Sequence, residues 1–250
     1  SDCAVVIGKN QNPWRESRLD LMHNEDVPLA RRISGGGTVY HDAGNLNYCI
    51  IVDRMEYREE QAYNMVLHTL ESLGVRAEKT GKSNLSINGL KFSGNAFCFR
   101  KNRVLHHGTL LLDTNLKRLT RYLGSMFNSI ETHAIRSVPA KVVNLELDVE
   151  SVSTSLKEHF QAMYGTGRAR MLPDCNLQPT PLEPLLEPLL EKQHSDDWKY
   201  GATPRFSINA CGHHLEVAKG IVVAASGRLP ERFLNMPFLL SAFSLPCDID

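Results

Sequence analysis

The sequence predicts an α+β protein, and three observations support this class. Apolar β-branched runs and amphipathic segments alternate irregularly, without the regular βαβ units of a doubly wound sheet. The pair Asn88-Gly89 separates two alternating segments, which is the strongest short signal of a β-hairpin. Residues from Glu59 to Leu73 place apolar side chains at helical spacing. Hairpin strands beside separate helices are typical of the α+β class.

Strands and one short helix are predicted in the N-terminal part of the chain. Ala4–Ile7 is a short apolar run and predicts a strand. Residues 12–14 (Asn-Pro-Trp) indicate a turn with an aromatic anchor, and Leu19–Asp26 indicates a short helix. A glycine-rich loop at 31–42 leads into a strand. Asn47–Val52 is nearly continuous in apolar residues, so we expect a strand that is buried on both faces.

Three further helices are predicted. Glu59–Leu73 is the clearest, since its apolar residues recur at i, i+3, i+4 and i+7. Leu116–Leu123 shows a shorter version of the same pattern. Ser155 and Glu158 have the spacing of a capping box, in a helix that is expected to reach Tyr164.

The remaining strands are expected in hairpins. Leu85–Ile87 and Leu90–Phe92 flank the Asn-Gly turn, whose type I′ form needs positive φ at both central residues. Lys91 therefore lies at the beginning of the returning strand. Leu105–Leu112 predicts another strand, and residues 215–223 predict two more around a short turn.

The composition excludes several classes of protein. The 250 residues (28.0 kDa) are 42% hydrophobic, which allows a sizeable core without disulfide or metal staples. The 28 Lys and Arg residues balance 28 Asp and Glu residues, so the charge excess that nonspecific binding to nucleic acid or an anionic membrane requires is missing. No apolar run approaches the length of a membrane-spanning helix. We therefore expect a soluble protein with neither nucleic-acid nor membrane partners.

The cysteines indicate the redox compartment. All six lie far apart, and no pair has the CxxC spacing of a zinc or redox site. This scatter favours reduced, buried thiols and a cytoplasmic location, or the mitochondrial matrix in a eukaryote. The chain opens with Ser1-Asp2-Cys3, has no initiator Met and enters a strand at once, which suggests either engineered ends or a fragment.

A change of composition suggests a boundary. Residues 176–197 are rich in leucine and glutamate and contain four prolines. They predict either a helix with proline interruptions or a linker, and we favour the linker. The expected organisation is a main domain at 1–178, a connector at 179–197 and a small domain at 198–250.

One glycine run has the composition of an anion-binding loop. In Arg31-Arg32-x-Ser34-Gly35-Gly36-Gly37, consecutive glycines let backbone N–H groups approach an anion with no Cβ in the way. An adjacent guanidinium adds a fork of donors that suits phosphate. The run lacks both the Lys-Ser/Thr of a Walker loop and the GxGxxG spacing. A flexible turn beside a solvated arginine pair is the alternative, and the run alone does not decide between them.

Lys91 and a histidine pair are the other candidates. Lys91 lies between Leu90 and Phe92, so its side chain points to the face opposite theirs. There it is either a positioned charge in a pocket or an ordinary exposed lysine. His106 and His107 are neighbours on a predicted strand, point to opposite faces and cannot bind one metal ion together.

Taken together, these runs resemble the lipoate–protein ligase A family of the biotin/lipoate protein ligase superfamily. The matching stretches are Arg31–Asn45, Lys91–Ala96 and His106–Leu111, with shorter ones at 5–8, 11–14, 137–145 and 198–207. The resemblance runs nearly end to end. It implies a mixed-sheet α+β catalytic domain at 1–178, a connector at 179–197 and a small accessory domain at 198–250 that is incomplete relative to the family.

The resemblance implies an ATP-dependent ligase. The carboxylate of lipoate would attack the α-phosphate of ATP to give lipoyl-AMP, and a carrier lysine would then displace AMP. Because the first step brings two anions together, fixed positive charge lowers its barrier, and Lys91 is the expected catalytic residue. Mg²⁺ is expected to neutralise the polyphosphate. The implied partners of the monomer are lipoyl carrier domains of 2-oxoacid dehydrogenases or the glycine cleavage H protein.

The same resemblance assigns three sets of residues. The nucleotide-binding set is Arg32, Gly35, Gly36, Gly37, Thr38, Val39, Tyr40 and Lys91. The lipoate-binding set is Lys91, Gly36, His41, His107 and Gly108. The loop that closes over the adenylate contains Arg136, Ser137, Val138 and Asn144. No residue is assigned to a metal.

Some features leave alternatives open. Relatives often have an acidic residue where this chain has Asn84, so metal handling or turnover would be altered. The nearest alternative is an acyltransferase of the same fold that moves octanoyl or lipoyl groups through a cysteine thioester, with Cys98 as a candidate. Such enzymes tend to have Gly-Gly-Arg in place of the triple glycine, which argues against it. A biotin ligase fits the double histidine less well. The other alternative is a non-catalytic binder of lipoate or of carrier domains.

Overall fold

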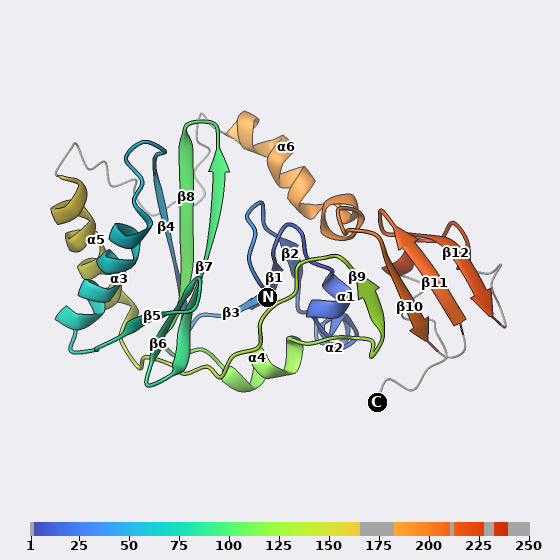
Figure 1. Ribbon diagram of the computed structural model, residues 1–250, viewed down its shortest axis with the longest axis horizontal. Helices are drawn as coiled ribbons and strands as arrows, with labels where there is room; N and C mark the ends of the chain where they lie inside the picture. Colours follow the sequence, from blue (N-terminus) through green and yellow to red (C-terminus); the bar gives the residue numbers. More distant parts are fainter. Residues whose placement is uncertain (1–2, 166–182, 211–212, 228–232, 240–250) are drawn as a thin grey trace. The chain divides into compact units, whose positions relative to one another are not determined.

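Two units of the chain each contain helices and strands (Figure 1). The computed structural model describes residues 3–165, 183–210, 213–227 and 233–239. The first unit combines the segments 1–42, 117–138 and 187–250, and the second combines 43–116 and 139–186. Helices and strands are mixed without βαβ repeats in both, so the predicted α+β class is confirmed.

The first unit contains two sheets. In one, β1 (Ala4–Ile7) pairs in parallel with β2 (Leu29–Arg31) and antiparallel with β3 (Val39–His41). The other is antiparallel in the order β12-β11-β10-β9. Its strands are β9 (Ile130–Thr132), β10 (Phe206–Ala210), β11 (His213–Ala218) and β12 (Ile221–Gly227).

An aromatic core centred on Trp14 fills the first unit. Trp14 is fully buried, and its ring centroid lies 5.1 Å from that of Phe206 and 5.0 Å from that of Phe238. Trp14 belongs to α1 (Pro13–Glu16), so the predicted turn at 12–14 is wrong. The Asn12 side chain accepts hydrogen bonds from the first helical N–H groups, and proline suits the first helical position, so this segment starts a helix. The other helices are α2 (Leu19–Asn24), α4 (Leu116–Tyr122), α6 (Glu183–His194) and the π-helix η1 (Asp197–Gly201).

The second unit is built on a five-stranded antiparallel sheet in the order β4-β8-β7-β6-β5. Its strands are β4 (Asn45–Asp53), β5 (Glu78–Thr80), β6 (Asn84–Ile87), β7 (Leu90–Arg100) and β8 (Arg103–Leu111). The β6–β7 turn has φ of 50° at Asn88 and 77° at Gly89, which confirms the predicted Asn-Gly hairpin. Helices α3 (Glu59–Ser72) and α5 (Val149–Tyr164) share one apolar core with this sheet and lie side by side (Figure 1).

Two predictions in the second unit are wrong. Strand β4 is buried on one face only, because Tyr48 and Ile50 face the helices while Ile51 is 64% exposed. A strand at the edge of an antiparallel sheet with helices on one side needs only one apolar face. Ser155 does not cap a helix either, since α5 begins at Val149 with Asp148 as its N-cap. Ser155 lies inside α5, where its hydroxyl contacts that of Ser72.

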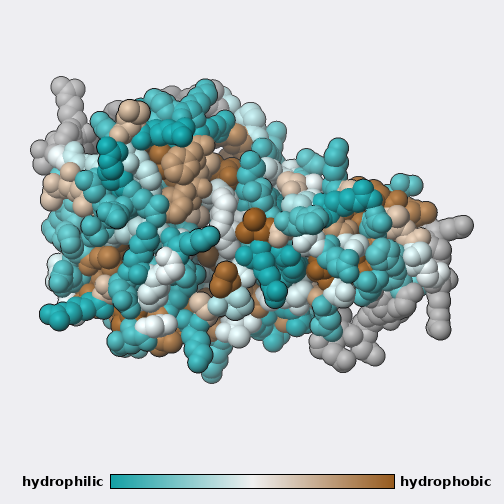
Figure 2. All heavy atoms as spheres, viewed as in Figure 1, coloured by the Kyte–Doolittle hydropathy of each residue, from teal (hydrophilic) through white to brown (hydrophobic). Residues whose placement is uncertain are grey.

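The connector and the surface complete the fold. The segment favoured as a linker is helical over Glu183–His194, with Pro188 inside α6, while residues 179–182 lie outside the described residues. The domain boundaries stay a prediction. The face in Figure 2 is mostly hydrophilic, with apolar side chains in small separate patches. In the described part, no helix is both long and apolar enough to cross a membrane. The described cysteines Cys3, Cys49 and Cys98 are free thiols, but Cys49 is exposed and not buried as predicted, because it lies on the face of β4 that points away from the core.

Candidate active site

The glycine loop after β2 is held in shape by Arg32. Its Nε and Nη2 donate to the carbonyl of Gly35 (3.1 and 2.7 Å), and Nη2 also donates to the carbonyl of Gly37 (2.6 Å). Its Nη1 donates to the carbonyl of Val6 (3.1 Å). Burial lowers the pKa of Arg32 to about 10. Three of its five N–H groups therefore shape the loop, a fourth bonds Val6 in β1, and one has no partner among the described residues.

Arg31 is neither solvated nor exposed to a ligand. It is fully buried, although its neighbour Arg32 is only partly so. Its guanidinium donates to the carbonyls of Lys9 (2.9 Å) and Gln11 (2.8 Å), and also to Lys199 in η1 (2.7 Å). Arg31 thus ties the segment after β1 to η1, within the first unit.

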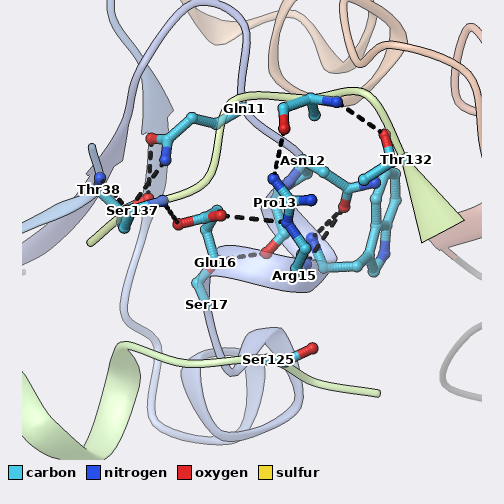
Figure 3. Close-up of polar contacts among 12 residues, drawn as sticks. Gln11, Asn12, Pro13, Arg15, Glu16, Ser17, Thr38, Ser125, Thr132 and Ser137 are labelled. Atoms are coloured by element: carbon cyan, nitrogen blue, oxygen red, sulfur yellow. Dashed lines mark hydrogen bonds and ion pairs between the residues drawn. The ribbon is translucent and has the colours of Figure 1, made fainter. Parts of the chain in front are cut away.

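Thr38 and Ser137, predicted in different motifs, lie together in the first unit (Figure 3). The Thr38 N–H donates to Ser137 Oγ (2.9 Å). Gln11 joins them, since its Nε2 donates to Ser137 Oγ (2.9 Å) and its Oε1 accepts from Thr38 Oγ1 (2.9 Å). Glu16 of α1 accepts the Ser137 N–H (3.0 Å). The glycine loop and the predicted adenylate loop are therefore hydrogen-bonded to each other.

Lys91 is positioned by an irregularity in β7. The pairing of β6 with β7 shifts so that Leu85 opposes Ser93 while Ser86 opposes Lys91. Phe92 and Ser93 are therefore consecutive residues that are both buried, as in a β-bulge. On the other side, the Lys91 N–H donates to the carbonyl of Lys141 (2.9 Å), so the backbone at this residue is hydrogen-bonded on both sides.

The amine of Lys91 lies over Gly94 on the same face of the sheet. A Cβ at Gly94 would lie 3.1 Å from Nζ and 3.3 Å from Cε of Lys91, so the glycine makes room for the ammonium. Lys91 is half-buried, and burial lowers the pKa of its amine. Among the described residues, no carboxylate or other hydrogen-bond acceptor pairs with Nζ. Lys91 therefore supplies a desolvated positive charge that is free to bind an anion.

The side chains of the two histidines of β8 point to opposite faces of the sheet, as the sequence predicts. His106 is fully buried, with its Nε2 3.0 Å from Asn95 Oδ1 and its Nδ1 3.2 Å from the Tyr57 hydroxyl. Burial lowers the pKa of His106 to about 4, so the ring is neutral at neutral pH. His107 is half-buried and pairs across strands with Ala96 and Cys49, on the other face.

Some of the other predicted residues are buried or bonded to the protein itself, and others are exposed or half-buried. A Cβ at Gly108 would lie 2.4 Å from Asn95 Oδ1, so this glycine makes room for the buried network. Asn144 bonds both backbone groups of Thr114 through its amide (3.1 and 2.9 Å). Tyr40 is buried in the aromatic core, whereas Val39 and His41 are half-buried on the opposite face of β3. Arg136 is exposed, and Val138 is 84% exposed. The roles assigned to these residues stay predictions.

The structure adds Gln11 and Glu16 to the candidate site. Both are buried polar residues, and both contact Ser137. The sequence contains one signal for them, because Gln11 begins the matching stretch at 11–14, but that stretch suggests no role. Thr38 and Ser137 belong to the first unit, whereas the second unit contains Lys91, His107, Gly108 and Asn144.

The described residues provide no preformed metal cage. Among them, no group of three or more His, Cys, Asp or Glu side chains lies close enough to hold an ion. Asn84, where the family resemblance predicts an acidic residue, has an amide side chain and supplies no carboxylate. Mg²⁺ usually binds proteins through one or two carboxylates plus substrate phosphates, so a preformed cage is not a requirement for a magnesium ion that acts on a nucleotide.

Comparisons with known proteins agree with the motif pattern. Residues 1–161 match the family model for the lipoyl protein ligase A/B catalytic domain. Lipoate-protein ligase A of Psychrobacter cryohalolentis is 34% identical over 223 residues, covering 85% of this chain and 63% of that protein. Its counterpart in Bdellovibrio bacteriovorus is 36% identical over 212 residues, covering 81% of this chain and 62% of that protein. The chain thus spans less than two thirds of the length of these relatives.

A solved structure supports the same assignment. A bipartite lipoate protein ligase from Thermoplasma acidophilum, studied with its E2 lipoyl domain, has a TM-score of 0.63. It is 25% identical, with 79% of this chain and 80% of that chain covered. The predicted family is therefore confirmed. Since the family model matches more than half of the residues, this chain belongs to the lipoyl protein ligase A/B catalytic domain family.

Proposed function

We propose that this protein activates lipoate with ATP and transfers the lipoyl group to a lysine of a lipoyl carrier domain. The observation that carries the proposal is the Lys91 amine, which is half-buried, partly desolvated and without a counter-ion among the described residues. A structural lysine in such a place would be expected to pair with a carboxylate or to extend into solvent.

The chemistry explains why this charge is useful. In the first step, a carboxylate oxygen of lipoate attacks the α-phosphorus of ATP, and the bond to pyrophosphate breaks to leave lipoyl-AMP. Two anions approach each other, so a preorganised cation between them lowers the barrier. In the second step, the amine of a carrier lysine attacks the acyl carbon, loses a proton and displaces AMP. Lys91 would then polarise the acyl carbonyl.

The glycine loop suits the nucleotide in this proposal. The bonds from Arg32 to the carbonyls of Gly35 and Gly37 fix the loop in advance. The backbone of residues 37–40 would line the nucleotide, with the Thr38 N–H already bonded to Ser137 Oγ. The remaining N–H of Arg32 would reach a phosphate oxygen. Mg²⁺ would enter with ATP and neutralise the pyrophosphate that leaves.

Partner and location are part of the proposal. The Thermoplasma acidophilum ligase was studied with an E2 lipoyl domain, which supports a carrier of that kind for this chain. The glycine cleavage H protein is the other expected carrier. We propose a monomer in the cytoplasm, or in the mitochondrial matrix of a eukaryote.

Mass spectrometry of a purified lipoyl domain tests this function. Incubation with the protein, ATP, Mg²⁺ and lipoate is expected to add one lipoyl group to one lysine. The variant Lys91→Ala should abolish lipoyl-AMP formation and keep the melting temperature close to that of the wild type. Cys98→Ser is the matched control from the same strand, and it should retain activity.

The same assay separates the alternatives. Transfer of a lipoyl group between carriers without ATP, lost in Cys98→Ser, would identify an acyltransferase. Binding of lipoate without pyrophosphate release would identify a non-catalytic binder. Full activity of Lys91→Ala would remove this residue from the mechanism.

A further inference from the structure

The hydroxyl of Ser137 has a fixed hydrogen-bond direction (Figure 3). It accepts a hydrogen bond from the backbone N–H of Thr38 at 2.9 Å, and a backbone N–H can only donate. It also accepts a hydrogen bond from Nε2 of Gln11 at 2.9 Å. A serine hydroxyl has two acceptor lone pairs and one hydrogen, so both acceptor positions of Ser137 are occupied.

The orientation of the Gln11 amide is fixed by the backbone as well. Oxygen and nitrogen of an amide are normally assigned from their hydrogen bonds. Here the Gly8 N–H donates to Gln11 at 2.8 Å, so the atom that faces it must be the oxygen. The nitrogen therefore faces Ser137. Because Gln11 is fully buried, water does not offer it an alternative partner.

The remaining hydrogen of Ser137 has no acceptor among the described residues. Glu16 accepts the Ser137 backbone N–H at 3.0 Å, so the residue is held by its main chain and by its side chain. Next to the hydroxyl lies Gly37, where a Cβ would be 3.1 Å from Ser137 Oγ. The missing side chain leaves space on the side of the glycine loop. Ser137 itself is half-buried, so a ligand can reach it.

We infer that Gln11 is a positioning residue that makes Ser137 a committed hydrogen-bond donor to a phosphate oxygen of the bound nucleotide. This inference rests on the proposed function. A free serine hydroxyl rotates and must be oriented when the ligand binds. Here two N–H donors orient it beforehand, and such preorganised donors are effective where negative charge is held or develops.

The variant Gln11→Glu reverses the polarity of this network with little change of shape. Its carboxylate can accept from Gly8, Thr38 and Ser137 at once, so the internal hydrogen bonds are kept. The hydrogen of Ser137 is then directed to residue 11 and is lost to the ligand. A hydrogen bond to a charged group is worth roughly 10- to 100-fold in affinity. Both Gln11→Glu and Ser137→Ala should therefore weaken ATP binding to the full chain by about that factor, measured by titration calorimetry.

A double-variant cycle distinguishes an effect on the direction of the Ser137 hydrogen bond from simple repulsion between the carboxylate introduced by Gln11→Glu and the nucleotide. If Gln11 acts through the hydroxyl, Gln11→Glu should cost nothing further in the Ser137→Ala background. The affinity of Gln11→Glu should also recover as the pH falls, because a protonated carboxyl can again donate to Ser137. Ser125→Ala removes an exposed serine hydroxyl whose hydrogen is already bonded to a carbonyl, and it should bind ATP like the wild type.

The outcomes separate this inference from the proposed function. A wild-type chain that does not bind ATP would overturn both. Wild-type binding that is unchanged in Ser137→Ala would overturn the inference alone, and this result does not depend on whether Gln11→Glu folds. An equal loss from Gln11→Glu with and without the Ser137 hydroxyl would show that charge repulsion acts, which would also overturn it.

Discussion

Arg31→Lys is a charge-conserving change that tests how the first unit is held together. The guanidinium of Arg31 makes five hydrogen bonds of 3.0 Å or less. Its acceptors are the carbonyls of Lys9, Gln11 and Lys199, the last of which is used twice, and the hydroxyl of Thr203. No carboxylate in the described part of the chain pairs with it. Burial lowers the pKa of Arg31 to about 10, so the charge is stabilised by these dipoles alone.

The expected loss follows from the count of donors. A lysine ammonium has three N–H groups, so at least one of the four acceptors is left without a donor. A buried acceptor left without a donor costs about 1–3 kcal/mol. Taking the middle of this range, Arg31→Lys should destabilise the protein by about 2 kcal/mol. In a chain of this length, that corresponds to a melting temperature roughly 4–8 °C lower.

Thermal and urea denaturation of the two proteins measure this difference. Arg103→Lys is the control, because Arg103 is exposed and pairs with Asp53 at the surface (2.9 Å). Exposed pairs contribute little, so this variant should melt within about 2 °C of the wild type. If Arg31→Lys melted as close to the wild type as Arg103→Lys does, the carbonyl cage would not be what stabilises the buried charge.

Three further results are expected. Gly94→Ala places a Cβ 3.1 Å from Lys91 Nζ, so the initial rate of lipoyl transfer, measured by mass spectrometry, should fall about ten-fold. Cys98→Ser, on the same strand, should keep its rate. Adenylate formation should decline with rising pH at a midpoint below the ordinary lysine value of 10.5, because burial lowers the pKa of Lys91 and deprotonation removes its charge; a midpoint above 10.5 would contradict this. Burial lowers the pKa of His106 from 6.5 to about 4. As the pH falls, the histidine is therefore protonated in the unfolded chain before it is protonated in the folded one. About 3 kcal/mol of the free energy of unfolding should be lost between pH 6.5 and pH 4. Urea denaturation of His106→Phe should lack this loss, and an unchanged pH slope would contradict the assignment.

Local patterns predicted much of the second unit. The Asn88-Gly89 turn follows from backbone sterics that these two residues relieve, so no distant contact is needed. Helix α3 ends as its sequence suggests, because Gly74 adopts φ of 82° and its N–H bonds the carbonyl of Glu71 (3.0 Å). Such features depend on residues a few positions apart, and so the sequence contains the whole cause.

The position of Lys91 could be predicted only in part. Alternation correctly puts its side chain opposite Phe92, but alternation also predicts that Gly94 lies on the other face. The bulge at Phe92 and Ser93 changes this, and a bulge depends on how β6 pairs with β7. Pairing register is a property of two strands, so one strand's pattern cannot reveal it.

Arg31 and Arg32 differ in burial and in hydrogen-bond partners because of tertiary contacts that the sequence motif does not contain. Both guanidinium groups bond backbone carbonyls, and neither forms an ion pair among the described residues. Two positive charges beside the glycine loop are therefore uncompensated by a carboxylate partner. In a partly buried site such charges are weakly screened, so they raise the local positive potential. The two arginines beside the loop would in this way also favour an anionic ligand there, although most of their donors never touch it.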